Sequence, residues 1–206
     1  MDFTLGEEDQ LLRDTVREWC DQKVRPHAAA WDEARALPAG LLEELGQMGL
    51  LAMEQPESEG GAGLSTVAAT ALIEELGAAD GSLALVVSAH NCLGLAHAAA
   101  GLEPNERARL RPAMVEGQQL VTLARSSDAD GTAGASHAAT RARREGDGWV
   151  LDGTETYVPL AAIAQQMVVL ATTDPAPTDA DTSVVAFLVD ASTQGVEVGE
   201  PVRTLG

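Results

Sequence analysis

The stretch Trp149-Val-Leu-Asp-Gly-Thr-Glu-Thr-Tyr157-Val-Pro159 is the part of the sequence that decides the fold. It follows a turn at Gly146-Asp-Gly148 and begins as a short strand that ends at Asp152. A second turn at Gly153 leads to an aromatic residue, Tyr157, at the start of another extended segment. Glycine turns that separate short apolar runs in this way predict a β-sheet in the second half of the chain.

Composition narrows the class of protein. The chain has 206 residues, of which 45% are apolar, and this is enough for one large core or two modest ones. Thirteen Lys and Arg against 32 Asp and Glu leave a net charge of −19, so nucleic acids and anionic membranes are poor partners. An acidic surface that keeps the protein soluble is favoured over a specific basic partner.

The two cysteines, Cys20 and Cys92, are far apart and have no metal-ligand spacing, which predicts a reduced, cytoplasmic protein without a metal site. No basic and then apolar signal opens the chain. The most apolar stretch, Leu83 to Ala100, contains Ser88, His90 and Asn91, so a buried helix is expected there rather than a membrane span.

Periodicity changes near Gly117, and we predict two domains, residues 1–117 and residues 118–206. Upstream, Leu, Ala and Glu recur at helical spacing, which indicates five helices. Thr4 and Glu7 have the spacing of a capping box for the first of them. The second helix is expected to begin at Leu37-Pro38 and stop at Gly49, and the third to run from about Ser65 to Leu76. The fourth is expected to be capped by Asp80 or Ser82, and the fifth to run from Pro104 to Gly117.

Downstream of Gly117, short runs rich in Val, Leu and Thr are bounded by Gly, Asp or Pro, as is typical of strands. The expected strands are Gln119 to Arg125, Ala138 to Glu145, Gly148 to Asp152, Gln166 to Thr173 and Ser183 to Asp190.

Several motifs resemble the acyl-CoA dehydrogenase family, in the family's order. The stretch from Trp149 to Pro159 is similar to G-D-x-Y/W-x-L/I-N-G-x-K-x-W/F-I-T of its middle domain, which forms one wall of the flavin site. Three further matches are Pro56 to Leu64 with P-E-x-x-G-G-x-G-L, Ser88 to Gly94 with S-x-H/N-x-S-L-G, and Ser183 to Gly199 with F-x-V-x-x-x-x-P-G-V-x-x-G.

The resemblance implies an α+β fold: an N-terminal α-helical bundle followed by a mostly antiparallel β-sheet or partial barrel, which is the middle domain of the acyl-CoA dehydrogenase type. It implies the family's chemistry in fatty acid metabolism. A Glu abstracts the proton α to a thioester, and hydride passes from the β carbon to flavin N5.

The family's flavin residues carry over in part. Ser127 and Asp128 stand opposite its Thr-Glu, and Ala133 stands at its Ser unless a one-residue slip places Thr132 there. Glu155 replaces the family's Lys, and Pro159 replaces its Thr or Ser. The resemblance implies these FAD-binding positions: Ser126, Ser127, Asp128, Thr132, Ala133, Tyr157 and Pro159.

The helix that lines the family's acyl-chain tunnel matches Ser88 to Gly94, so Val86, Ala89 and His90 are the expected substrate-binding residues. From the residues alone, a core or tunnel-wall role for His90 is favoured over a catalytic one, because no serine or carboxylate is placed to make it a base.

No residue matches the family's catalytic Glu, which lies in a carboxyl-terminal helical domain. We therefore expect a subunit or half-chain of a heteromeric acyl-CoA dehydrogenase-type flavoenzyme, acting on an acyl-CoA or acyl-carrier thioester. A protein partner, or a homo- or hetero-oligomer of the family, would supply that domain, and the isolated chain is expected to be inactive and flavin-free. The alternative is a non-catalytic structural or regulatory subunit that kept the fold and lost flavin binding.

Overall fold

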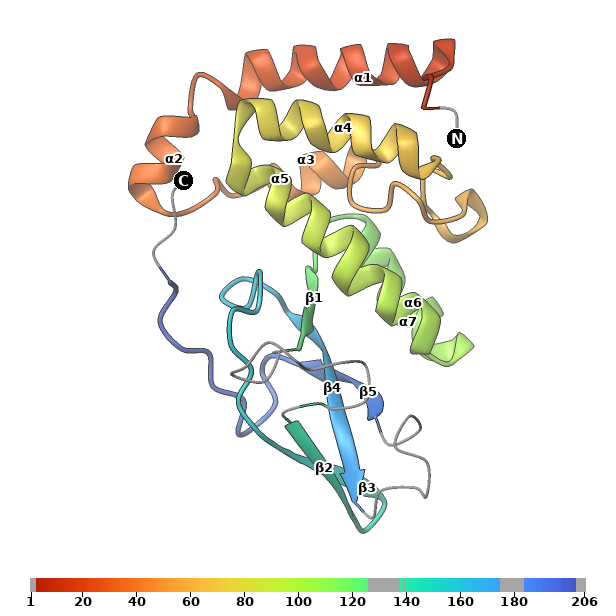
Figure 1. The fold of residues 1–206 in the computed structure, drawn as a ribbon, viewed down its shortest axis with the longest axis vertical. Coiled ribbons are helices and arrows are strands. Elements are labelled where there is room, and N and C mark those ends of the chain that lie inside the picture. The colour runs from red at the N-terminus through yellow and green to blue at the C-terminus, as the bar shows by residue number, and fades with distance from the viewer. Residues whose placement is uncertain (1–2, 126–137, 139, 175–183, 203–206) are drawn as a thin grey trace. The chain divides into compact units, whose positions relative to one another are not determined.

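The computed structural model describes residues 3–125, 138, 140–174 and 184–202 (Figure 1). The chain divides into two compact units. The first is built mainly from Met1–Asn91 and Ala108–Gln119, and the second from Cys92–Arg107 and Leu120–Val202. The predicted boundary between residues 117 and 118 stays a prediction.

The helices begin with α1, Glu7–Trp19, which continues as the π-helical turn η1. Alanine, leucine and glutamate dominate these segments, as their helical propensities require. The bounds are η1 Cys20–Val24, α2 Ala28–Ala34, α3 Leu41–Gln47, η2 Glu57–Glu59, α4 Thr66–Ala79, α5 Gly81–Ser88, η3 Ala89–Leu95, α6 Ala96–Gly101 and α7 Pro104–Val115.

The core of the first unit includes one face of α1. Val16 and Cys20 are fully buried in one hydrophobic cluster, and Leu12 and Trp19 pack against that cluster from the same face of α1. The indole Nε1 of Trp19 also donates to Glu44 of α3 at 2.8 Å, so α1 and α3 are joined by a polar contact at the edge of the core.

The predicted cap at Asp80 is confirmed, and Ser65, where a helix was expected to begin, is the N-cap of α4. Ser65 accepts from the backbone N–H of Ala68, and Asp80 accepts from the N–H of Leu83 at 2.7 Å. The expected capping box is wrong, because α1 begins at Glu7 with Gly6 as its N-cap. Gly6 has no side chain that can accept from the first turn, so this helix depends on packing rather than on a cap.

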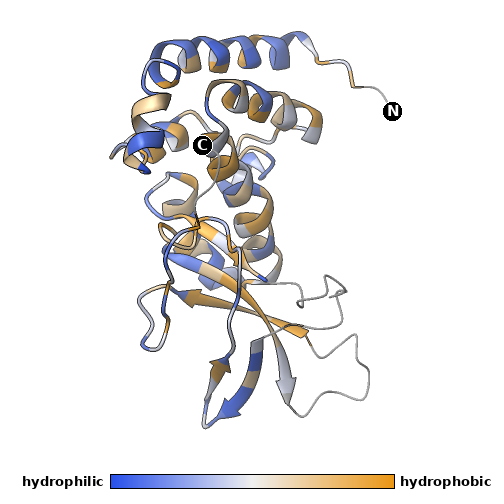
Figure 2. Ribbon diagram, turned by 60° about the vertical axis from the view of Figure 1, so that its left-hand side comes forward, coloured by the Kyte–Doolittle hydropathy of each residue, from blue (hydrophilic) through white to orange (hydrophobic). Residues whose placement is uncertain are grey.

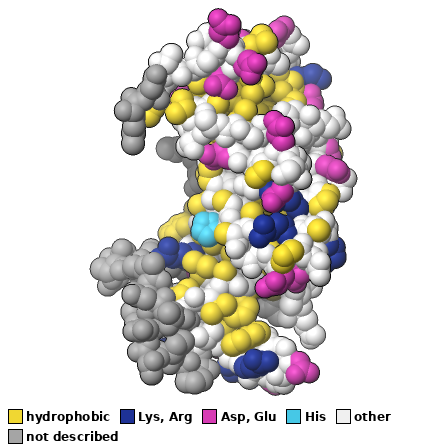
Figure 3. All heavy atoms as spheres, turned by 90° about the vertical axis from the view of Figure 1, so that its right-hand side faces the viewer, with side chains coloured by type: hydrophobic (Ala, Val, Ile, Leu, Met, Phe, Trp, Pro, Cys, Tyr) yellow, Lys and Arg dark blue, Asp and Glu magenta, His cyan; other side chains and the backbone are white. Residues whose placement is uncertain are grey.

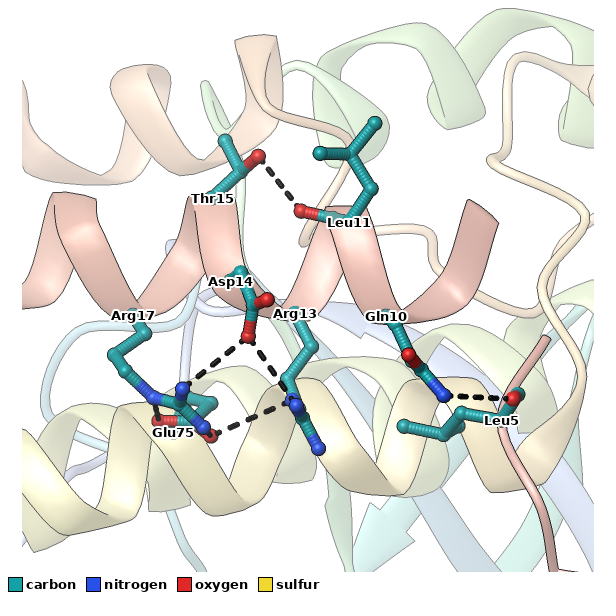
Figure 4. A network of polar contacts seen from close by, with 8 residues as sticks. All are labelled: Leu5, Gln10, Leu11, Arg13, Asp14, Thr15, Arg17 and Glu75. Atoms are coloured by element: carbon teal, nitrogen blue, oxygen red, sulfur yellow. Dashed lines mark hydrogen bonds and ion pairs between the residues drawn. The ribbon is translucent and has the colours of Figure 1, made fainter. Parts of the chain in front are cut away.

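A charged network joins α1 to α4, which lie side by side (Figure 1). Arg17 donates to both carboxylate oxygens of Glu75, at 2.6 and 3.0 Å, and this bidentate contact raises the pKa of the Arg17 guanidinium. Figure 4 shows Asp14 between Arg13 and Arg17, at 3.2 Å from each. Tertiary packing thus brings Arg17 of α1 to Glu75 of α4.

The glycine-rich loop after α3 is a structural turn. Gly60 and Gly63 have φ of 83° and 64°, and a Cβ on Gly61 would lie 2.1 Å from the carbonyl oxygen of Gln55. Arg111 of α7 is buried and ties this loop to the helix: it donates to Gln55 at 2.6 Å and pairs with Glu59. Burial lowers the pKa of Arg111.

The second unit contains a five-stranded sheet in the order β1-β4-β2-β3, with β5 also paired to β4. The predicted fold class, a helical bundle followed by a sheet, is confirmed. The bounds are β1 Val121–Ala124, β2 Thr140–Glu145, β3 Gly148–Asp152, β4 Gln166–Asp174 and β5 Val184–Asp190.

The sheet is mixed, which the local sequence does not reveal. Strand β4 runs antiparallel to β5 and parallel to both β1 and β2, which meet it at residues 166–169 and 171–174. Strands β2 and β3 form the expected antiparallel hairpin, and Trp149 of β3 contacts Phe187 of β5 edge-on at 5.4 Å. The strands β1 and β2 therefore lie end to end along one edge of β4.

Hydropathy differs between the elements, and α1 is largely hydrophilic in Figure 2.

One helical stretch, Gly81–Gly101, is long and apolar enough to cross a membrane by length and composition alone. However, 56% of its most apolar window is buried within the protein. The buried core helices of soluble proteins meet the same two criteria, so this match is weak support for a membrane span. On the face drawn in Figure 3, Asp and Glu side chains are scattered singly rather than gathered in one patch.

Candidate functional site

The candidate site begins at the loop that follows β3, residues 153–160, which we name the tyrosine loop. Its first residue, Gly153, packs directly on β2, because a Cβ there would lie 2.6 Å from the Cα of Thr140. Any larger residue would push the loop away from the strand. The glycine that marks a turn in the sequence is thus required by a close approach of two backbones.

Two buried threonines bind the tyrosine loop on either side of its aromatic residue. Thr140 of β2 donates a short hydrogen bond to the Oε1 atom of Glu155. Thr122 of β1 donates to the carbonyl oxygen of Pro159 at 2.6 Å. Both threonines are at least 96% buried, since their exposed fractions are 0% and 4%. Sequence reasoning missed them, because threonine in a strand is ordinary.

Tyr157 lies between these two contacts with its ring in solvent. The residue is 86% exposed, and its backbone has a φ of 55° in the left-handed region, so the expectation that Tyr157 begins another extended segment is wrong. Such a conformation costs a residue other than glycine about 1 to 3 kcal/mol, and it persists only where neighbouring contacts impose it. The predicted stacking residue therefore has an open face.

The tyrosine loop has some, but not all, of the groups that would bind a planar ring. Tyr157 can stack on one, since its face is free. Pro159 has no N–H, as the sequence predicts, and its carbonyl is already bonded to Thr122. Among the described residues, no acceptor is bonded to the backbone N–H of Val158 or Leu160, so these two donors remain beside Pro159.

The other predicted flavin positions, Ser126, Ser127, Asp128, Thr132 and Ala133, lie outside the described residues. In the described part of the chain, no group of three or more His, Cys, Asp or Glu is placed to hold a metal ion. A surface hollow of about 340 Å³ in the first unit, lined by Glu43, Gln47 and Glu116 among others, contains none of the predicted site residues.

The predicted substrate residues lie together on the helix that runs through α5 and η3. Val86, Ala89 and His90 are buried, with exposed fractions of 8%, 2% and 0%, so none of them presents an open surface within the first unit. Leu85 on the same helix is 57% exposed, and sequence reasoning did not select it. Their role in substrate binding stays a prediction.

Asn91 is a further residue for which the sequence predicted no role in the site. Its Oδ1 accepts from the backbone N–H of Met53, and its Nδ2 lies 2.9 Å from the carbonyls of both Leu50 and Val87. This buried amide fastens the segment that leads into the glycine-rich loop to the helix that carries His90. A short polar side chain in an otherwise apolar helix is the signal that could have found it.

Comparison with protein-family models gives the class of this chain. Residues 6–118 match the acyl-CoA dehydrogenase N-terminal domain, and residues 122–206 match the acyl-CoA dehydrogenase middle domain. The chain therefore belongs to the acyl-CoA dehydrogenase family.

Individual relatives agree. The chain is 36% identical over 203 residues to the mitochondrial short-chain specific acyl-CoA dehydrogenase of Homo sapiens, with 98% of this chain and 48% of that protein aligned. It is 29% identical to the 3-(aryl)acrylate reductase of Clostridium sporogenes, over 97% of this chain and 52% of the reductase. The chain spans about half the length of the curated relatives it matches.

Solved structures show the same fold. The glutaryl-CoA dehydrogenase of Mycobacterium smegmatis in complex with FADH2 superposes with a TM-score of 0.86 at 26% identity, over 98% of this chain and 50% of that one. The chain thus shares its fold with a relative whose structure contains FADH2.

Proposed function

We propose that these 206 residues form the N-terminal and middle parts of a flavoenzyme that dehydrogenates an acyl thioester between its α and β carbons, and that a protein partner supplies the helical region with the catalytic Glu. The substrate class is an acyl-CoA or acyl-carrier thioester, and a cytoplasmic location is part of the proposal. Matches to two consecutive domains of the family, together with a fold shared with an FADH2-bound dehydrogenase, support it.

The observation that carries the proposal is the open ring of Tyr157 beside two available backbone N–H groups. The exposed tyrosine face can stack on an isoalloxazine ring, and the N–H groups of Val158 and Leu160 can donate to its polar edge. A bound flavin supplies the hydride acceptor. Val86, Ala89 and His90 are the residues proposed to line the acyl chain.

Pro159 weakens this site but does not remove it. One missing donor to a buried polar ring costs about 1 to 3 kcal/mol, or roughly ten- to a hundredfold in affinity. The neighbouring donors and the aromatic face remain. The chain alone is therefore expected to hold no flavin, and binding is expected only in a complex with the partner.

A second function, that of a non-catalytic companion subunit, is favoured by a different observation. Glu155 and the carbonyl of Pro159 are both occupied by hydrogen bonds from buried threonines. At Glu155, where this chain departs from the family motif, the side chain thus serves the protein's own structure, whereas the Pro159 contact uses a backbone carbonyl that any residue would provide. A chain that kept the fold for assembly alone can carry such changes.

The test is to purify the chain from its source with whatever accompanies it, and to record the absorbance spectrum and thioester dehydrogenation with an artificial electron acceptor. A yellow complex with flavin absorbance near 450 nm, a companion protein and activity would support the enzyme. A colourless complex that releases no flavin on denaturation would refute it and leave the companion subunit. A yellow, active preparation of the 206 residues alone would refute the need for a partner.

A further inference from the structure

The tyrosine loop is held by a frame that reaches beyond its own hairpin. Thr122 lies on β1 and Thr140 lies on β2, and both strands pair in parallel with the same edge of β4. The hydrogen bonds of these threonines reach Pro159 and Glu155, two residues on either side of Tyr157. One sheet edge therefore sets the positions of both flanks of the tyrosine.

The conformation of Tyr157 is imposed from outside the residue. Because Tyr157 is 86% exposed, its ring gains little from packing, and a φ of 55° is unfavourable for tyrosine. Contacts on either side of Tyr157 must therefore supply the stabilisation that the exposed ring does not. Glu155 and Pro159 are the flanking residues at which the structure shows such contacts from neighbouring strands.

The chemistry of Glu155 suits this role. A carboxylate only accepts hydrogen bonds, so it matches a threonine hydroxyl that donates. A lysine, which stands at this position in the motif the chain resembles, only donates and would need the opposite arrangement. Thr140 of β2 supplies the buried donor that the Glu155 carboxylate needs.

We propose that Thr140 and Glu155, with Thr122, are positioning residues that hold the Tyr157 ring preformed as a stacking surface for a planar flavin ring. In this assignment the Glu155 carboxylate serves as an internal acceptor and is not a ligand of the cofactor. The stacking part of the inference rests on the proposed flavin function, whereas the positioning part does not.

The sequence makes a direct test possible, because Tyr157 is the only tyrosine in the chain. Labelling the full chain with ¹⁵N-tyrosine gives a single amide resonance, whose order parameter reports the loop. We expect a value of about 0.85, as for rigid backbone, and a fall below about 0.6 in Thr140→Val and in Glu155→Ala. Glu155→Gln should keep the rigid value, because its amide oxygen still accepts.

Thr154→Val and Thr156→Val are matched controls. Both threonines are exposed, flank Glu155 and take the same substitution. They should leave the order parameter unchanged. A Tyr157 amide that stays rigid in folded Glu155→Ala overturns the positioning role, even if Thr140→Val fails to fold. Loss of order in the controls as well would overturn it too, because the effect would then not belong to this hydrogen bond.

Titration with FAD in the presence of the co-purifying partner tests the stacking role. We expect the FAD dissociation constant to rise at least tenfold in Thr140→Val and Glu155→Ala, and less than twofold in the two controls and in Glu155→Gln. An equal affinity in all variants overturns preformed stacking. If the unmodified complex binds no FAD, the proposed function and the stacking role both fail, while the order measurements still decide the positioning role.

Discussion

The side-chain oxygen of Asn91 accepts a hydrogen bond from the backbone N–H of Met53 at 2.9 Å, in the interior of the first unit. The same amide group lies within hydrogen-bonding distance of two carbonyls, those of Leu50 and Val87. One side chain therefore satisfies backbone groups of a segment that is neither helix nor strand. Such a segment can be buried only when its polar groups are paired.

Replacing Asn91 with Ala should lower the free energy of unfolding by about 2 to 4 kcal/mol, because several buried backbone groups lose their partner at once. Urea denaturation followed by circular dichroism measures the change. Asn105→Ala is the control, since Asn105 is exposed at the start of α7 and should change stability by less than about 0.5 kcal/mol. Equal stability of the two variants would contradict the role of Asn91.

Replacing Gly94 with Ala should be severely destabilising. A Cβ there would lie 2.0 Å from the carbonyl oxygen of Val121, and backbone in a strand cannot move aside cheaply. We expect a loss of about 3 kcal/mol or more in the free energy of unfolding, measured as above. Gly101→Ala, at a site with nothing within 4 Å of the added carbon, should be nearly neutral. A neutral Gly94→Ala would show that η3 does not pack on β1 in this way.

Replacing Glu75 with Gln should lower the midpoint temperature of unfolding in dilute buffer, because Arg17 loses a bidentate, charged acceptor. Salt should remove most of this difference, since screening acts over about 3 Å at 1 M ionic strength. Glu74→Gln is the matched control, because the adjacent Glu74 is exposed. Thermal scans of both variants at low and high salt provide the measurement. A salt-independent loss in Glu75→Gln would indicate packing rather than charge.

The two cysteines should differ in reactivity. Burial raises the pKa of Cys20 to about 11, so its thiol stays protonated, whereas Cys92 is exposed. Iodoacetamide at pH 8 should modify one thiol in the native chain and two in urea, as counted by mass spectrometry. Modification of both thiols at equal rates in the native chain would show that Cys20 is accessible.

The raised pKa of Cys20 also makes the stability of the protein depend on pH. The thiol of Cys20 ionises near its ordinary pKa of 9.0 in the unfolded chain but only near 11 in the folded chain. The contribution of the Cys20 thiol to the free energy of unfolding is therefore complete below pH 9 and is lost as the pH rises toward 11. The free energy of unfolding should fall more steeply over this range in the unmodified chain than in Cys20→Ala. Equal slopes would contradict the shift.

Substitutions at Tyr157 distinguish the two proposed functions, the flavoenzyme and the non-catalytic companion subunit. If the ring stacks on flavin, Tyr157→Phe should retain flavin in the purified complex, because the aromatic face remains, and Tyr157→Ala should lose most of it. Flavin released on denaturation, per mole of chain, is the measurement. Equal flavin content in all three proteins would remove the stacking role, and no flavin in any of them would favour the companion subunit.

Much of the local structure could be predicted from residue patterns. The strand Gly148–Asp152 has the predicted bounds, and Asp80 caps its helix as expected. Gly49 and Gly117 have φ of 77° and 76°, as their places after α3 and α7 suggested. These features depend on residues a few positions apart, so hydrophobic periodicity and turn chemistry determine them. The family motifs likewise drew attention to Glu155, Tyr157 and Pro159.

Only the tertiary structure decided how these local pieces meet. The parallel pairing of β4 with β1 and β2, the hydrogen bond from Thr122 to Pro159 across 37 positions of the chain, and the ion pair of Arg17 with Glu75 join distant residues. The composition of a strand does not specify its partner or its register, and a threonine in a strand does not show whether its hydroxyl meets water or a loop. Those outcomes depend on packing of the whole sheet and bundle, because a buried donor is tolerated only where the fold brings an acceptor to it.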